Sequence, residues 1–119
     1  MESLPVTVVE MPDFIAAARK LMRDDERMSL LDYLARNPLD GALIPGSGGM
    51  RKVRWALEGR GKRGGARIIY YFHGVQVPLF VLDVYAKNER AEVSAKDVKR
   101  LKQVVKLIVS EFVKVSDKP

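Results

Sequence analysis

The sequence predicts an α+β fold in which two N-terminal helices precede a group of strands and one further helix follows them. Three observations predict this fold. Apolar residues recur at helical spacing in the first third of the chain, alternate with polar ones in the middle, and return to helical spacing near the end. The chain has 119 residues, of which 47% are apolar, so it can bury one ordinary core. We therefore expect residues 1–119 to form a single domain.

The first elements are a short strand and two helices. Residues 6–9 form a β-branched run that is typical of a strand. Pro12 suits the first turn of a helix, because the backbone N–H that proline lacks has no helical partner there. A second helix is predicted over residues 26–36 and ends before Pro38, which disfavours helical geometry in the residue preceding it. The short link between the helices indicates a helical hairpin.

Two alternating segments predict neighbouring strands with one polar face. Residues 50–57 place Lys52 and Arg54 on the face opposite their apolar side chains. Residues 66–72 are predicted to form a second strand, in which Arg67 shares one face with Ile69 and Tyr71. If the two strands pair antiparallel, the three cations can share a face.

A long apolar segment and a final helix complete the predicted elements. Residues 75–87 are apolar on both faces, as expected for a central strand that is covered on both sides. Ser94, with Asp97 three residues later, is typical of a helix N-terminus. The helix carries an apolar stripe that either packs on the sheet or forms a seam with a partner, and its members are Val98, Leu101, Val105, Ile108, Phe112 and Val115.

The net charge is concentrated in residues 51–67. This segment holds seven basic residues and one acid, which accounts for the whole formal charge of +6. A charge so localised favours a polyanionic partner such as nucleic acid. Arg51 and the loop residues Lys62 and Arg63 are candidates for contacts with an RNA backbone.

Lys52, Arg54 and Arg67 are the candidate catalytic cluster. Like charges at close range repel one another, so a purely structural sheet gains nothing from them. In RNA cleavage the 2′-hydroxyl attacks the adjacent phosphorus, and fixed cations stabilise the charge that gathers on the phosphate oxygens. The alternative is a solvated polar face with non-specific affinity for nucleic acid. Tyr71 and Tyr85 are candidates for stacking on unpaired bases.

Other classes of function receive little support from the composition. The chain has no cysteine and a single histidine, His73, so no metal site and no cofactor is expected. No segment approaches the ~20 apolar residues of a membrane span, and the N-terminus does not resemble a signal peptide. We expect a cytoplasmic protein.

Three blocks of sequence resemble the RelE/HigB superfamily of bacterial toxins, particularly its HigB-like branch. The blocks are residues 48–55 (GGMRKVRW), 61–71 (GKRGGARIIYY) and 85–89 (YAKNE). The resemblance runs from about residue 41 to the C-terminal helix. It implies a helical hairpin packed on a small, mainly antiparallel sheet, with a C-terminal helix.

The resemblance also implies a function. Such proteins are toxins of type II toxin–antitoxin pairs, and they cleave mRNA in the ribosomal A site without a metal. The implied partners are the ribosome, mRNA and a HigA-like antitoxin in the bacterial cytoplasm. Lys52 and Arg54 match a pair of basic residues on a strand of RelE-like toxins, and Arg67 matches an arginine that opens the next strand. Arg67 would then contact the scissile phosphate, while Lys52 and Arg54 position it and transfer a proton or neutralise charge.

Two positions depart from the pattern of RelE. Asn88 stands where RelE has an arginine, and Ser94 where it has a tyrosine. Lys87 is the nearest cation and would assist the leaving oxygen, while Tyr85 or Tyr71 would replace the missing ring. Because the HigB-like branch shares the Tyr-Ala-Lys-Asn-Glu block, we interpret the departure as a feature of that branch.

Two other functions compete with this one. ParE-like toxins resemble the same scaffold but act on DNA gyrase and do not require the full cationic set. A non-toxic RNA-binding module is the third hypothesis. The order in which protein synthesis and DNA replication stop after induction distinguishes the mRNA endoribonuclease from the gyrase toxin.

Overall fold

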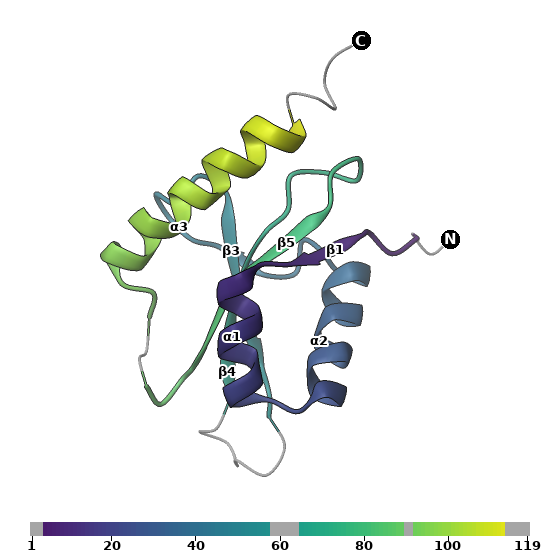
Figure 1. The fold of residues 1–119 in the computed structure, drawn as a ribbon, viewed down its shortest axis with the longest axis vertical. Coiled ribbons are helices and arrows are strands. Elements are labelled where there is room, and N and C mark those ends of the chain that lie inside the picture. Colours follow the sequence, from purple (N-terminus) through teal and green to yellow (C-terminus); the bar gives the residue numbers. More distant parts are fainter. Residues whose placement is uncertain (1–3, 58–64, 90–91, 114–119) are drawn as a thin grey trace.

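The computed structural model describes residues 4–57, 65–89 and 92–113, which form a five-stranded sheet and its flanking helices (Figure 1). In chain order the elements are β1 (Val8–Glu10), α1 (Pro12–Leu21), α2 (Asp24–Arg36), β2 (Ala42–Leu43), β3 (Met50–Trp55), β4 (Ala66–Tyr71), β5 (Leu79–Ala86), α3 (Ala95–Ile108) and a π-helical turn, Val109–Val113. The predicted α+β fold is confirmed.

The sheet has the order β1-β5-β4-β3-β2 and is mainly antiparallel, as predicted. Among the described strands, only β1 pairs in parallel, with residues 79–81 of β5. The central strands β4 and β5 are almost wholly buried. β3 has only the two-residue strand β2 on its outer side, so the basic face of β3 lies near an edge of the sheet.

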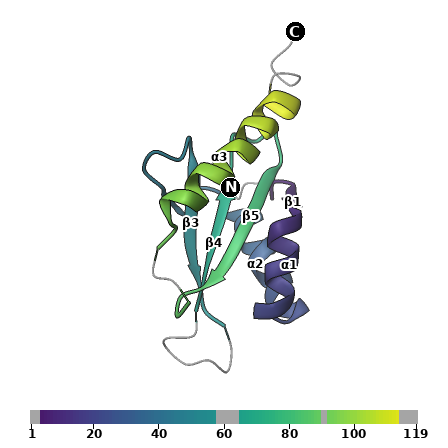
Figure 2. The ribbon, with the colours of Figure 1, turned by 60° about the vertical axis from the view of Figure 1, so that its left-hand side comes forward.

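The helices cover opposite faces of this sheet. The hairpin α1–α2 packs on one face, where Phe14, Leu34 and Tyr70 belong to one buried cluster. α3 packs on the other face, where Leu101 and Val105 join a second cluster that contains Ile69 and Phe80. Figure 2 shows the strands between α3 and the hairpin. The first four members of the predicted stripe therefore pack on the sheet. Phe112 lies in the π-helical turn and is 43% exposed, although its ring contacts Phe80.

Some boundaries differ from the predictions. β5 begins at Leu79 and not at residue 75, because the backbone N–H of Val77 bonds to the carbonyl of Gly74 and closes a turn. α2 begins two residues earlier than predicted, at Asp24. Val115, the last member of the predicted stripe, lies outside the described residues.

Tyr70 anchors the loop that leads into β2. Its hydroxyl donates to the carbonyl of Pro38 at 2.9 Å and accepts the backbone N–H of Gly41 at 2.8 Å. Gly41 has no room for a side chain, because a Cβ there would lie 2.7 Å from the Tyr70 hydroxyl and 2.9 Å from the carbonyl of Lys52. This close packing fixes the position of the chain just before β2, where Ala42 lies opposite Lys52 of β3.

The Tyr70→Phe variant should be less stable by about 1–3 kcal/mol at neutral pH, because it leaves a buried N–H without its acceptor. Burial raises the pKa of Tyr70. Above about pH 10 the unfolded chain therefore loses this proton before the folded one does, and the contribution of Tyr70 to stability falls as the pH rises. Urea unfolding at several pH values provides the measurement. The difference in the free energy of unfolding between wild type and variant should become smaller above pH 10. Equal stability at pH 7 would contradict this role.

Arg100 ties α3 to the rest of the protein. Its guanidinium donates to Asp13 at the start of α1 at 2.7 Å and to the buried Asp83 of β5 at 3.2 Å. It also lies 3.7 Å from Asp97 in the first turn of α3. One side chain thus links α3 to β5 and to α1 on the other face of the sheet.

Candidate nucleic-acid site

The predicted cationic cluster forms on the α3 face of the sheet. In the antiparallel register of β3 and β4, Arg54 lies directly opposite Arg67. Lys52 is two residues from Arg54 on β3 and therefore points to the same face. Side chains directly opposite in such a pair have Cβ atoms roughly 4.5–5.5 Å apart, and like charges there destabilise the sheet. The register confirms the predicted shared face.

The three cations line one hollow of about 410 Å³. Its lining consists of Asp40, Ala42, Lys52, Val53, Arg54, Arg67 and Glu92. Arg54 is exposed, and Lys52 and Arg67 are half-buried. None of the three cations forms an ion pair with another residue in the described ranges. Their charge is therefore available to an anionic ligand.

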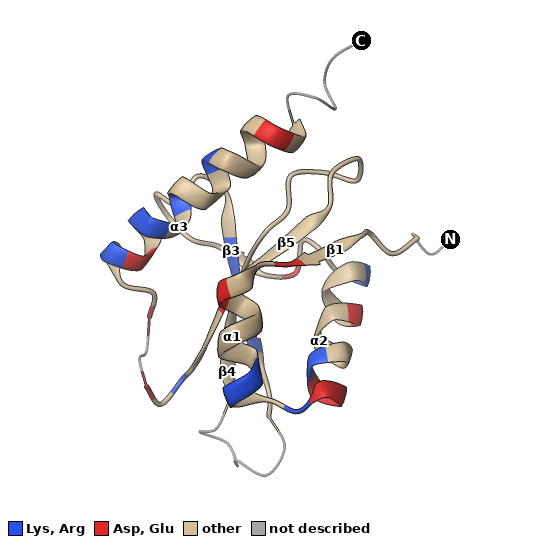
Figure 3. Cartoon of the chain, viewed as in Figure 1, with Lys and Arg blue, Asp and Glu red and all other residues tan. Residues whose placement is uncertain are grey.

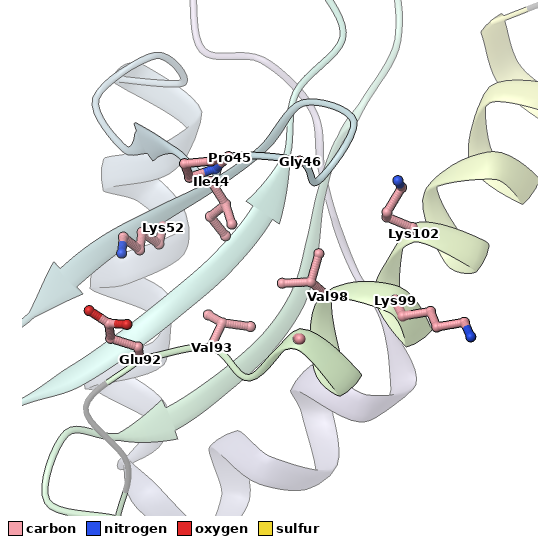
Figure 4. A pocket seen from close by; sticks show the side chains of 10 residues that line it. Ile44, Pro45, Gly46, Lys52, Glu92, Val93, Val98, Lys99 and Lys102 are labelled. Atoms are coloured by element: carbon pink, nitrogen blue, oxygen red, sulfur yellow. The ribbon is translucent and has the colours of Figure 1, made fainter.

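Glu92 is a site residue that sequence reasoning did not select. It precedes α3 and contributes a carboxylate to the hollow that the three cations line. Glu92 and Lys52 also line a second cavity, the groove between α3 and the segment before β3, and Figure 4 shows them at the same end of it. Glu92 lies on a connection between elements, where the sequence has no periodic pattern that would indicate which way a side chain points. The available clue was that Glu92 follows closely on the YAKNE block at residues 85–89, which carries part of the family resemblance.

Arg51 points away from this cluster. It lies opposite Tyr70, on the face that the helical hairpin covers. Its guanidinium donates to the backbone carbonyls of Leu39 at 3.2 Å and Gly41 at 2.7 Å. These bonds show that Arg51 supports the loop before β2, so the predicted contact of Arg51 with RNA would have to compete with them.

The two candidate stacking residues are both buried. Tyr85 lies opposite Arg67 in the β4–β5 pair and is 2% exposed. Tyr71 is 6% exposed, and its hydroxyl lies 3.2 Å from Nδ1 of His73. Burial also raises the pKa of the Tyr71 hydroxyl. Neither ring presents an open face to a base in this conformation, so the burial argues against the predicted stacking. Tyr85 is instead a packed neighbour of Arg67.

Lys87 lies on the turn after β5, and its side chain is exposed. Its backbone N–H donates to the carbonyl of Gly65 at 3.0 Å, which places it beside the start of β4. It does not contribute to the lining of the hollow. The predicted loop contacts Lys62 and Arg63 lie outside the described residues.

In the part of the chain that the structure describes, no three histidine or carboxylate side chains gather in a way that would hold a metal ion. The described helices also include none with the length and apolar character needed to cross a membrane. The chemistry available at this site is that of two guanidinium groups, one ammonium group and two carboxylates. Of the carboxylates, that of Asp40 accepts a hydrogen bond from the hydroxyl of Tyr33.

Comparison with known proteins identifies the class. The family model for the RelE toxin of the RelE/RelB toxin–antitoxin system matches residues 8–115. The chain belongs to this toxin family, and membership implies a cognate antitoxin. Among solved structures, the free state of an E. coli RelE mutant with two arginines changed to alanine matches with a TM-score of 0.53 and 17% identity. The match covers 93% of this chain and 97% of that one, so the RelE-like fold extends over nearly the whole length.

Proposed function

We propose that the protein is a ribosome-dependent mRNA endoribonuclease of the HigB-like branch, which inhibits translation in the bacterial cytoplasm. The observation that carries the proposal is the placement of Arg54 opposite Arg67, with Lys52 beside them, in one open hollow. Like charges that lie opposite one another destabilise a strand pair, and an anionic partner would relieve their repulsion. A phosphodiester supplies that partner.

The cluster suits cleavage by an internal nucleophile. When the ribose 2′-oxygen attacks phosphorus, the P–O5′ bond breaks and a 2′,3′-cyclic phosphate forms, while negative charge gathers on the phosphate oxygens. In this proposal Arg67 and Arg54, which line one hollow, hold those oxygens, because arginine offers paired donors for phosphate. Lys52 adds a third positive charge. No metal is required in this scheme.

Proton transfer requires an acceptor and a donor. Two carboxylates line the hollow, and that of Asp40 already accepts a hydrogen bond from Tyr33. Glu92 is therefore our candidate to take the proton of the 2′-hydroxyl, with Lys52 in its uncharged form as the alternative. Lys87 is our candidate to donate a proton to the leaving oxygen, because its turn adjoins the strand that carries Arg67. The ribosome would supply the in-line geometry of the message. Free RNA should therefore be cleaved negligibly.

The proposed antitoxin is HigA-like and would neutralise the toxin. The competing proposal, a ParE-like action on DNA gyrase, lacks a comparable observation, because such an action does not require the Lys52, Arg54 and Arg67 set.

Induction of the protein in bacteria distinguishes the two proposals. Incorporation of labelled amino acid and of labelled thymidine should be followed together from the moment of induction. Our proposal expects protein synthesis to stop first. An earlier arrest of DNA replication would replace it with the gyrase hypothesis.

A further inference from the structure

We propose that the groove between α3 and the segment before β3 is a nucleotide-binding subsite that receives the base next to the scissile phosphate. The inference rests on the proposed function and deepens it, because it states where the RNA strand continues beyond the cationic cluster. Neither the family membership nor the predicted cluster assigns this groove.

The groove has the size and the floor that a base requires. Its volume is about 650 Å³, within the range of about 300–1,000 Å³ that is common for ligand pockets. Figure 4 shows the side chains of Ile44, Val93 and Val98 between the segment before β3 and α3. Ile44 is buried, and the two valines are half-buried. Apolar side chains of this kind pack against the faces of bases that have left a stack.

The rim of the groove is basic. Lys52, Lys99 and Lys102 line it, and the two lysines of α3 lie one helical turn apart. Figure 3 shows Lys and Arg recurring along α3. Neither Lys99 nor Lys102 is ion-paired within the described part of the chain. An apolar floor with cations around it is complementary to a nucleotide, whose base is apolar on its faces and whose phosphate is anionic.

The groove is continuous with the cationic hollow. Lys52 and Glu92 line both. A strand whose phosphate lies against Arg67 can therefore place its neighbouring nucleotide in the groove without crossing a barrier of protein. Glu92 at the junction can accept a hydrogen bond from a ribose hydroxyl, which DNA lacks. These features favour single-stranded RNA as the occupant.

The Ala95→Glu variant tests the groove. Ala95 lines the groove, is exposed and opens α3, where a glutamate suits the helix N-terminus. The probe is a labelled 2′-O-methyl RNA hexamer, which lacks the attacking hydroxyl, and fluorescence anisotropy at low salt measures its affinity for the free protein. We expect the variant to bind about tenfold more weakly, the size of one lost base contact. Gln103→Glu, which makes the same charge change at an exposed α3 position outside the lining, should change the affinity less than twofold.

A lysine pair provides a second, independent test. Lys102→Gln should weaken binding and lower the slope of log affinity against log salt by about 0.7, the value for one phosphate contact on a single strand. Lys96→Gln removes a lysine of the same helix that does not line the groove and should leave the slope unchanged.

A hexamer with one abasic residue should bind wild type more weakly than the intact hexamer, and Ala95→Glu should remove that difference.

The outcomes separate this proposal from the proposed function. Equal affinity of wild type and Ala95→Glu for the intact hexamer would overturn the proposal that the groove binds a nucleotide, even if wild type cleaves translated mRNA. A base-dependent affinity that Ala95→Glu abolishes would support the groove, even where wild type shows no cleavage, and in that case the endoribonuclease proposal alone would fall.

Discussion

Replacing Arg67 by alanine is expected to lower ribosome-dependent cleavage by about 10²–10³-fold, the usual effect of removing one fixed donor to a developing oxyanion. Arg67 is the candidate because β4 lies between β3 and β5, so its side chain is flanked by Arg54 on one side and the buried Tyr85 on the other. A side chain packed in this way is held in position before RNA arrives. Cell-free translation with quantified mRNA ends provides the measurement.

The variant should fold normally. Arg67 makes no ion pair with another described residue, and its removal relieves the repulsion from Arg54 across the strand pair. Its melting temperature should therefore equal or slightly exceed that of wild type. Arg19→Ala is the matched control, because it removes an exposed guanidinium from α1 on the other face of the sheet. A folded Arg67→Ala protein with wild-type cleavage would place the reaction elsewhere.

Replacing Glu92 by glutamine is expected to lower the cleavage rate by about 10²-fold or more, within the range of general base catalysis. Glutamine keeps the volume and hydrogen-bonding ability of glutamate but cannot take a proton. Because the variant also loses a negative charge beside the three cations, its affinity for an uncleavable RNA should stay the same or rise. A fall in rate without a fall in affinity distinguishes proton transfer from binding.

Glu89→Gln is the control for this experiment. Glu89 lies on the turn after β5, is exposed and does not line the cationic hollow. It should cleave like wild type. If Glu92→Gln also cleaves like wild type, then Glu92 is not the proton acceptor, and Lys52 is the next residue to test.

Much of the fold follows from periodicity in the sequence. The alternation of residues 50–57 and 66–72 assigned Lys52, Arg54 and Arg67 to one face, and the register confirms it. The stripe of the last helix predicted its buried side, and the proline at residue 38 predicted the end of α2. These features are local, so the sequence contains them directly.

The features that the sequence did not reveal depend on tertiary contacts. Alternation shows which residues share a face, but it does not show how much of that face another element covers, so Tyr71 and Tyr85 were expected at the surface. Arg51 was expected to contact RNA, yet it bonds to carbonyls of a loop ten or more residues away. Glu92 lines the cationic hollow because of the path of the connection between β5 and α3, which no periodicity in the sequence predicts.

The most direct test of the central claim is primer extension on a defined message after purified protein is added to a cell-free translation reaction, with a parallel reaction that lacks ribosomes. Our account predicts new mRNA ends inside translated codons, absent without ribosomes and absent with Arg67→Ala. An intact message with undiminished translation, or equal cleavage in the reaction without ribosomes, would contradict it.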